Sequence, residues 1–258
     1  MGKFDGILLT SDWDGTLISK NTLNPRDIEA IRYFQKNGGS FTVCTGRDLP
    51  HIRMFFDDVK PNTYLIALNG AKIIHPDSLE IIYEGFLDNG VYRVLDELFV
   101  DESYFTDMNV YLEGMNDSVY FYPHEYAEYH DKMLLRRAYK ILLYGDSEEK
   151  VLEAQARANA LGLDGYVFVR SWKYSLELLK KKNAKGAAIR RLAEHINAKK
   201  LIAVGDFEND IQMLEAADIG YAVGDATDAL KKVADRVTVP AAEGAISHII
   251  EDIEKELK

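Results

Sequence analysis

Short apolar runs alternate with helical periodicities in the first third of the chain. The runs lack the strict apolar/polar alternation of half-exposed strands, which predicts strands covered on both faces. These runs occupy residues 6–11, 40–45 and 63–68. Between the first two, Asn24 and Pro25 are typical of a helix N-cap and first helical position, and Ile28, Ile31 and Phe34 follow at helical spacing. This order is typical of a parallel sheet built from βαβ units.

The same order returns in the last third, with a different pattern between. Strand-like runs occupy residues 200–205, 218–223 and 236–239, and Ile246, Ile249, Ile250 and Ile253 predict a closing amphipathic helix. The middle is rich in Tyr, Phe and Val, which favours strands. Its predicted strands are 105–114, 118–123, 139–145, 165–171 and 174–180, and its predicted helices contain Val91, Val94, Leu95 and Leu98, and Val151 and Leu152.

These patterns predict an α/β protein with an inserted domain. We expect a Rossmann-like core with a mostly parallel sheet, formed by residues 1–82 and 183–258. Residues 83–182 are expected to form an α+β cap domain. The core is then discontinuous in sequence.

Composition and charge restrict the partners of this chain. A 258-residue protein with 47% apolar and 28% charged residues is typical of a soluble globular fold. A net charge of -11 disfavours nucleic acid as a partner, since that binding needs clustered Lys and Arg. No apolar stretch is long enough to span a membrane, and the first residues lack a secretory cleavage region. We expect a cytoplasmic protein, a monomer or a weak homo-oligomer, whose lone Cys44 is a small buried hydrophobe.

Two carboxylates follow the first predicted strand. Asp12 and Asp14 are separated by Trp13 and followed by Gly15, which permits a turn toward an anion. Open α/β sheets bind ligands at the carboxyl ends of their strands. Asp12 is therefore a candidate nucleophile in phosphoryl transfer, and Asp14 a candidate acid and base. The alternative is an acidic turn that only caps local structure.

The next two strands also end in polar residues. Thr45, Gly46 and Arg47 follow the second strand, and Asn69 and Gly70 follow the third. A hydroxyl, an amide and several backbone N–H groups at one sheet edge are suited to phosphate oxygens. Taken separately, Thr-Gly and Asn-Gly are also common turn sequences after a strand.

Acidic residues follow the strand at 200–205 in the same way. Asp206, Asn209 and Asp210 precede a helix, and hard Mg²⁺ favours such oxygen ligands. Helix capping is the alternative. Lys185 begins the helix that returns the chain to the core, where a cation opposes the helix dipole and so indicates another role. Otherwise Lys185 belongs to a solvated linker with the lysines at 180–182, of which Lys182 is the second candidate.

Together these motifs resemble the haloacid dehalogenase superfamily, in particular its Cof-type phosphatases with a large α/β cap. DWDGTL resembles the first motif of that family, FTVCTGR the second, NAKG the third and GDFENDIQML the fourth. The resemblance covers the whole core. Trp13 stands where the family has an aliphatic residue, which affects packing more than chemistry.

The resemblance implies roles for the candidate residues. Asp12 is implied as the nucleophile and a metal ligand, Asp14 as the acid and base with its carbonyl on Mg²⁺, and Asp206 as a direct ligand. Asp210 supports the lysine and the metal. The implied phosphate and substrate contacts are Thr45, Gly46, Arg47, Asn69, Gly70, Lys185 and Asn209. Asp14 also favours the phosphoester-cleaving branch of the superfamily over dehalogenases and cation pumps.

The expected function is hydrolysis of a small phosphorylated metabolite, such as a sugar phosphate or a phosphorylated cofactor. A phosphomutase of the same superfamily and a silent metabolite-binding or regulatory protein are the alternatives. The cap is expected to choose the substrate. His124, Glu125, Glu128 and His130 are a weaker candidate for a second metal site, because scattered His and Glu residues are usually surface groups.

Overall fold

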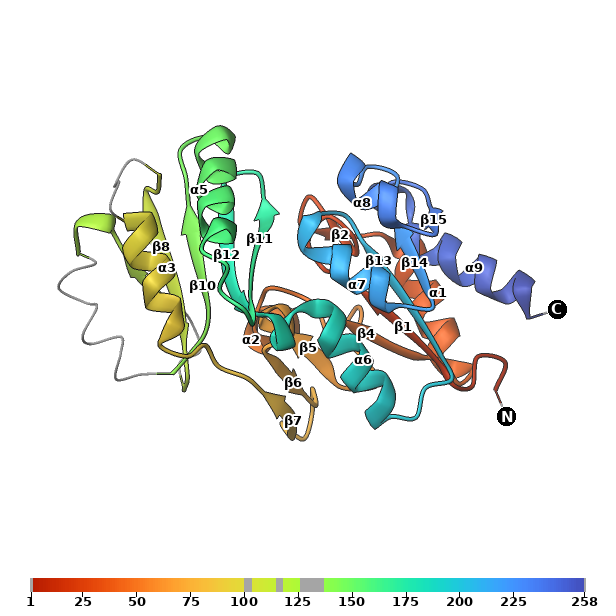
Figure 1. Ribbon diagram of the computed structural model, residues 1–258. Coiled ribbons are helices and arrows are strands. Elements are labelled where there is room, and N and C mark those ends of the chain that lie inside the picture. The colour runs from red at the N-terminus through yellow and green to blue at the C-terminus, as the bar shows by residue number, and fades with distance from the viewer. Residues whose placement is uncertain (1, 100–103, 115–117, 126–136, 258) are drawn as a thin grey trace. The chain divides into compact units, whose positions relative to one another are not determined.

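The computed structural model describes residues 2–99, 104–114, 118–125 and 137–257. The chain divides into two compact units (Figure 1). The core unit contains Met1–Tyr83 and Lys185–Lys258, and the cap unit contains Glu84–Ala184. No helix in the described part of the chain is long and apolar enough to cross a membrane.

A five-stranded parallel sheet organises the core unit. Its strand order is β15-β14-β13-β1-β4, so β1, the first strand of the chain, lies inside the sheet. The strands are β1 (Ile7–Ser11), β4 (Ser40–Val43), β13 (Lys200–Gly205), β14 (Ile219–Ala222) and β15 (Arg236–Val237). All five residues of β1 are buried, as expected for a strand covered on both faces.

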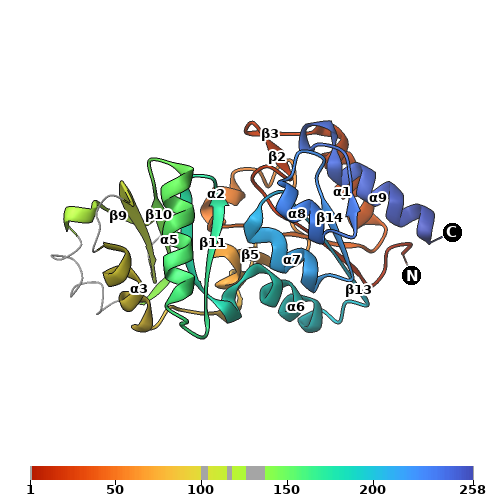
Figure 2. The same cartoon turned by 45° about the horizontal axis from the view of Figure 1, so that its top comes forward.

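Helices cover the two faces of this sheet (Figures 1 and 2). Right-handed crossovers toward β4 and toward β14 run in opposite directions, which places α1 and α7 on opposite faces. On one face α1 packs against α9, and on the other α6 packs against α7. These helices are α1 (Pro25–Lys36), α6 (Lys185–His195), α7 (Ile211–Ala216) and α9 (Ala245–Glu256). The side chain of Asn24 caps α1 through the Arg26 N–H, as predicted.

The third apolar run departs from the predicted parallel arrangement. β5 (Leu65–Ala67) pairs antiparallel with β6 (Lys72–Ile74), and β6 continues into β7 (Ile81–Glu84) as a separate three-stranded sheet. Only an isolated parallel bridge joins Ile66 to Cys44 at the end of β4. An antiparallel hairpin satisfies the backbone of β5 locally, which an apolar run alone does not reveal.

Short elements complete the core unit. They are β2 (Ile18–Ser19), β3 (Thr22–Leu23), α2 (Leu49–Arg53), α8 (Asp228–Val233) and the 3₁₀ turns η1 (Leu68–Gly70), η4 (Glu208–Asp210) and η5 (Ala241–Glu243). β2 and β3 form a hairpin directly after the first acidic motif.

In its described residues, the cap unit contains an antiparallel sheet and the helices α3 and α5. Its strand order is β11-β12-β10-β8-β9, and α3 and α5 pack against each other. The elements are α3 (Gly90–Phe99), β8 (Asp107–Leu112), β9 (Val119–Phe121), η2 (Pro123–Glu125), β10 (Ala138–Tyr144), α5 (Glu148–Ala160), β11 (Tyr166–Trp172), β12 (Ser175–Lys180) and η3 (Lys181–Asn183).

Side chains from both helices and the sheet form the apolar core of the cap. Alternate residues of β8 are buried, which is the period of a strand with one covered face. The apolar residues on which the prediction of the first cap helix rests, which are Val91, Val94, Leu95 and Leu98, lie in α3 and all belong to this core. The second predicted helix, around Val151 and Leu152, is α5, in which Val151 is buried and Leu152 is exposed.

Candidate active site

Asp12 lies directly after β1, at the carboxyl edge of the parallel sheet. Its backbone N–H donates to the Val204 carbonyl at 2.9 Å, which extends the pairing with β13 by one residue. The loop then turns back, since the N–H groups of Leu17 and Ile18 both donate to the Trp13 carbonyl. Trp13 itself is buried and meets the Phe55 ring edge-on at 5.2 Å. The indole therefore anchors the loop that presents Asp12.

Gly15 lets this loop approach the end of β13. Its φ is +85°, and a Cβ at this position would lie 2.3 Å from Oδ2 of Asp206. The next residue, Thr16, donates its hydroxyl to Oδ1 of Asp206 at 3.3 Å. The role of Thr16 was not predicted, although it lies in the quoted motif. The two loops are thus held together by a glycine contact and a hydroxyl.

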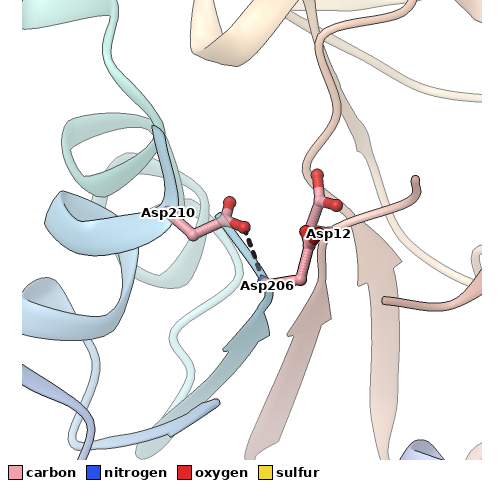
Figure 3. Close-up of side chains that lie close together, drawn as sticks. All are labelled: Asp12, Asp206 and Asp210. Carbon is pink, nitrogen blue, oxygen red and sulfur yellow. Dashed lines mark hydrogen bonds between the residues drawn. The ribbon is translucent and has the colours of Figure 1, made fainter. Parts of the chain in front are cut away.

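Asp206 and Asp210 bring two further carboxylates to Asp12 (Figure 3). Asp210 is fully buried, and its Oδ2 accepts hydrogen bonds from the N–H groups of Asp206 at 3.0 Å and Phe207 at 3.4 Å. One carboxylate oxygen from each of the three aspartates lies within 4.8 Å of the other two. The capping role considered for this segment is therefore real for Asp210, but it coexists with the cluster.

Lys185 joins the acidic residues from the first position of α6. Its Nζ lies 2.5 Å from Oδ1 of Asp12 and 2.6 Å from Oδ1 of Asp210, and the side chain is 1% exposed. A solvated linker lysine would not be buried between two carboxylates, so the linker alternative is wrong for Lys185. The same contacts explain a cation at the start of a helix, where the dipole alone would disfavour it.

Burial and mutual repulsion perturb the ionisation of the cluster. Burial raises the pKa of Asp12 to about 7, although Lys185 opposes the shift. Burial, together with Asp12 and Asp210, raises the pKa of Asp206 to about 9. For Lys185, burial alone would lower the pKa, but Asp12 and Asp210 hold it well above its usual value.

The donor set suits a divalent metal ion. Three carboxylates with one ammonium group leave the cluster short of positive charge, and burial together with the neighbouring carboxylates raises the pKa values of Asp12 and Asp206. All the side-chain ligands are oxygens, the chemistry that Mg²⁺ prefers. Asp12, Asp206 and Asp210 therefore fit a divalent metal ion. The carbonyl of Asp14, the other predicted ligand, is two residues from Asp12 in the sequence.

The polar residues that follow the second and third predicted strands are joined by backbone hydrogen bonds. Thr45 is buried, and its backbone N–H donates to the Ile66 carbonyl at 2.9 Å. The Asn69 N–H donates to the Thr45 carbonyl at 2.8 Å, which brings the two strand ends together. Asn69 and Gly70 have positive φ values of 56° and 104°. Cys44 is buried next to Thr45, and burial raises the pKa of its thiol, as expected for a core residue.

The guanidinium group of Arg47 binds the carboxylate of Asp14. Its Nε and Nη2 donate to Oδ2 and Oδ1 of Asp14, each at 2.7 Å. The sequence did not predict this pair. Gly46 and Asn209 are partly exposed, the latter in η4 between Glu208 and Asp210. The phosphate-binding roles assigned to Thr45, Gly46, Arg47, Asn69, Gly70 and Asn209 stay predictions.

The weaker candidate for a second metal site is only half described. His124 stacks on the Tyr122 ring at 5.7 Å, and Glu125 accepts a hydrogen bond from the Tyr122 N–H. Glu128 and His130 lie outside the described residues. Within the described residues, the group of potential metal ligands is Asp12, Asp206 and Asp210.

Comparisons with known proteins agree with this arrangement. The family model for haloacid dehalogenase-like hydrolases matches residues 9–250. The phosphatase YwpJ of Bacillus subtilis is 27% identical over 95% of this chain and 99% of its own. The 5-amino-6-(5-phospho-D-ribitylamino)uracil phosphatase YitU of the same organism is 23% identical over 95% of this chain and 96% of its own.

Solved structures show the same fold. A haloacid dehalogenase-like hydrolase from B. subtilis superposes with a TM-score of 0.78 at 25% identity, covering 95% of this chain and 98% of that one. A subclass IIB sugar phosphatase, BT4131, gives a TM-score of 0.75 at 20% identity, covering 95% and 98%. Because each match covers 95% of this chain, it extends over both the core unit and the cap unit. These relationships identify a phosphoric monoester hydrolase, and the chain belongs to the haloacid dehalogenase-like hydrolases.

Proposed function

We propose that this enzyme hydrolyses a small phosphorylated metabolite through a covalent aspartyl-phosphate on Asp12, in a reaction that depends on Mg²⁺. The observation that carries the proposal is Lys185, which is buried between Asp12 and Asp210 at 2.5 and 2.6 Å. This contact joins the end of β1 to the start of α6 and to the turn after β13. Such convergence of distant segments on one carboxylate supports a catalytic role for Asp12.

The first step transfers the phosphoryl group to the protein. Lys185 binds Oδ1 of Asp12, which leaves Oδ2 of that carboxylate to attack phosphorus. A bond forms between this oxygen and phosphorus while the ester P–O bond breaks. Asp14 gives a proton to the leaving oxygen. The ammonium group of Lys185 offsets negative charge as the phosphoryl group approaches three carboxylates.

The second step returns the protein to its starting state. Asp14 takes a proton from a water molecule whose oxygen attacks phosphorus, and the bond between Asp12 and phosphorus breaks. Inorganic phosphate is released. Asp12, Asp206 and the Asp14 carbonyl would hold Mg²⁺, and Asp210 would support this site. The bound ion would offset negative charge on the phosphoryl oxygens.

The substrate is proposed as a phosphorylated sugar or cofactor precursor. Relatives named as phosphatases of a phosphoribityl compound and of sugars support this class. We also infer that the enzyme acts in the cytoplasm, as a monomer or a weak homo-oligomer, on free metabolites rather than on nucleic acid. The net charge of -11 supports the exclusion of nucleic acid.

A phosphate-release screen of sugar phosphates and phosphorylated cofactors tests the proposal, with Mg²⁺ and after chelation. Asp12→Asn should lower kcat on the best substrate by about 10³-fold or more, since a carboxamide is a poor nucleophile. The matched control is Asp228→Asn, an exposed acid in the first turn of α8. Full turnover by Asp12→Asn would refute the covalent mechanism, and undiminished turnover after chelation would refute the metal dependence.

A further inference from the structure

Arg47 and Asp14 form a bidentate ion pair, which is more specific than most contacts between exposed charged side chains. Two nitrogens of one guanidinium group bind two oxygens of one carboxylate, both at 2.7 Å. This bidentate arrangement fixes the plane of the carboxylate as well as its position. Exposed ion pairs usually add little to stability, and these side chains are 43% and 50% exposed. The pair is therefore better explained by orientation than by stability.

Hydrogen bonds fix the backbone at Arg47 and next to Asp14. The Arg47 N–H donates to the Thr45 hydroxyl at 3.1 Å, and the Arg47 carbonyl accepts from the Leu68 N–H at 3.1 Å. On the other side, the Gly15 N–H donates to the Ile18 carbonyl at 2.9 Å. The guanidinium group is thus held by β4 and η1, while the carboxylate is held by the loop after β1. Their contact ties two strand ends through one side-chain pair.

The orientation matters for one half of the proposed reaction. A carboxylate that accepts two hydrogen bonds from a guanidinium group keeps lone pairs for a further donor. In the second step that donor is the attacking water. The sequence assigned Arg47 to phosphate, but its guanidinium group is directed at Asp14 in the structure.

We propose that Arg47 is a positioning residue that orients Asp14 as the base for hydrolysis of the aspartyl-phosphate. The inference rests on the proposed function, in which water attacks the phosphoryl group on Asp12. The bond from water oxygen to phosphorus forms, the bond from Asp12 to phosphorus breaks, and the proton of water goes to Asp14. Without Arg47 the half-exposed carboxylate can rotate away, and this second step slows more than the first.

Rapid-mixing kinetics with p-nitrophenyl phosphate and Mg²⁺ test the proposal. Nitrophenolate is a good leaving group, so the first step depends little on Asp14 as an acid. In Arg47→Ala the release of nitrophenolate should show a burst approaching one per enzyme, with the burst rate constant of the wild type. The steady rate should then fall by about 10-fold or more, and KM should fall with it, because the covalent intermediate accumulates. Arg47→Lys, which keeps the charge without the fork, should recover part of the steady rate.

The matched control is Arg190→Ala, which removes another exposed Arg–Asp pair, to Asp218 at 3.3 Å, outside the site. It should retain wild-type kinetics, and both variants should keep the thermal midpoint of the wild type. A raised KM without a burst in Arg47→Ala would overturn the proposal in favour of phosphate binding. Kinetics identical to the wild type would overturn it in favour of an inert surface pair. Failure of the proposed function is distinct, since the wild type would then release no nitrophenolate or Asp12→Asn would remain active.

Discussion

At the scale of single residues, Gly15 has a role that no other residue can fill. It combines a φ of +85° with a close approach to Asp206, since a Cβ at this position would clash with Oδ2 of Asp206 at 2.3 Å. A side chain there would strain the turn and displace the carboxylate that completes the acidic cluster. The glycine therefore sets the distance between the loops after β1 and β13.

We expect Gly15→Ala to lower kcat by about 10²-fold, because a shift on the order of 1 Å in a catalytic group has that effect. The measurement is phosphate release with the best substrate of the screen. Gly162→Ala is the matched control, since Gly162 also has a positive φ, of 59°, but nothing lies within 4 Å of its would-be Cβ. Both variants carry backbone strain, so equal activity in the two would show that contact with Asp206 is unimportant.

The residues of the site show what the sequence could and could not predict. Asp12, Thr45 and Asp206 follow β1, β4 and β13, and neighbouring parallel strands place their carboxyl ends at one edge. Their convergence was therefore predictable from strand order. The partner of Arg47 was not, because a guanidinium group binds phosphate and carboxylate equally well. The close approach of Gly15 to Asp206 was hidden for a different reason, since it depends on the φ of Gly15 and on the position of the Asp206 side chain, which strand order does not specify.

At the scale of elements, Asp27 shows how two helices at opposite ends of the chain are joined. Asp27 lies in the first turn of α1, where the sequence pattern indicates only an ordinary favourable acid. In the structure it is fully buried, and its Oδ1 accepts the Ser247 N–H at 2.7 Å. The N-cap of α9 is Gly244, which offers no side-chain acceptor. Asp27 thus caps α9 from another helix.

The burial of Asp27 makes the stability of the protein depend on pH. Burial raises the pKa of Asp27 to about 6, although backbone hydrogen bonds from Ser247 and Ile246 oppose the shift. The pKa in the folded state exceeds the ordinary value of 3.8, so the unfolded chain loses this proton first as pH rises. The contribution of Asp27 to stability is therefore fully present below about pH 4 and is lost as pH rises through about 6.

We expect Asp27→Asn, which cannot ionise, to be more stable relative to the wild type at about pH 7.5 than at about pH 4.5. Asp27→Ala should lower the free energy of unfolding by about 1 kcal/mol at the lower pH, through loss of the cap. Urea unfolding of the three proteins at both pH values measures the differences. The comparison with the wild type cancels the titration of other groups. A difference between Asp27→Asn and the wild type that is independent of pH would contradict the predicted role.

At the scale of the whole molecule, the core unit is formed by two separate segments of the chain, whereas the cap unit is formed by one. The core sheet pairs β1 with β13, which are separated by the entire cap unit. The order of apolar runs predicted a discontinuous core, but it gave no indication of the separate sheet of β5, β6 and β7. Pairing partners of a short apolar run depend on turns and on competing strands, which periodicity does not describe.

The cap unit is continuous in sequence, and its apolar core closes on itself. Every member of its buried cluster lies between Leu87 and Leu178. Both helices, α3 and α5, cover the same sheet with their apolar residues, so no strand from the core unit is needed to complete it. A domain with its own core and its own sheet is expected to fold alone.

We therefore expect a fragment of residues 84–184 to fold, and a fragment of residues 1–83 to remain unfolded. The second would leave β1 without β13, and Asp12 without the lysine that offsets its burial. Circular dichroism and thermal unfolding measure both: the cap fragment should melt cooperatively, and the other should show no transition. Leu95→Asp places a charge at a fully buried position of α3 and should abolish the transition of the cap fragment. If the cap fragment gave no cooperative melt, its core would have to depend on the rest of the chain.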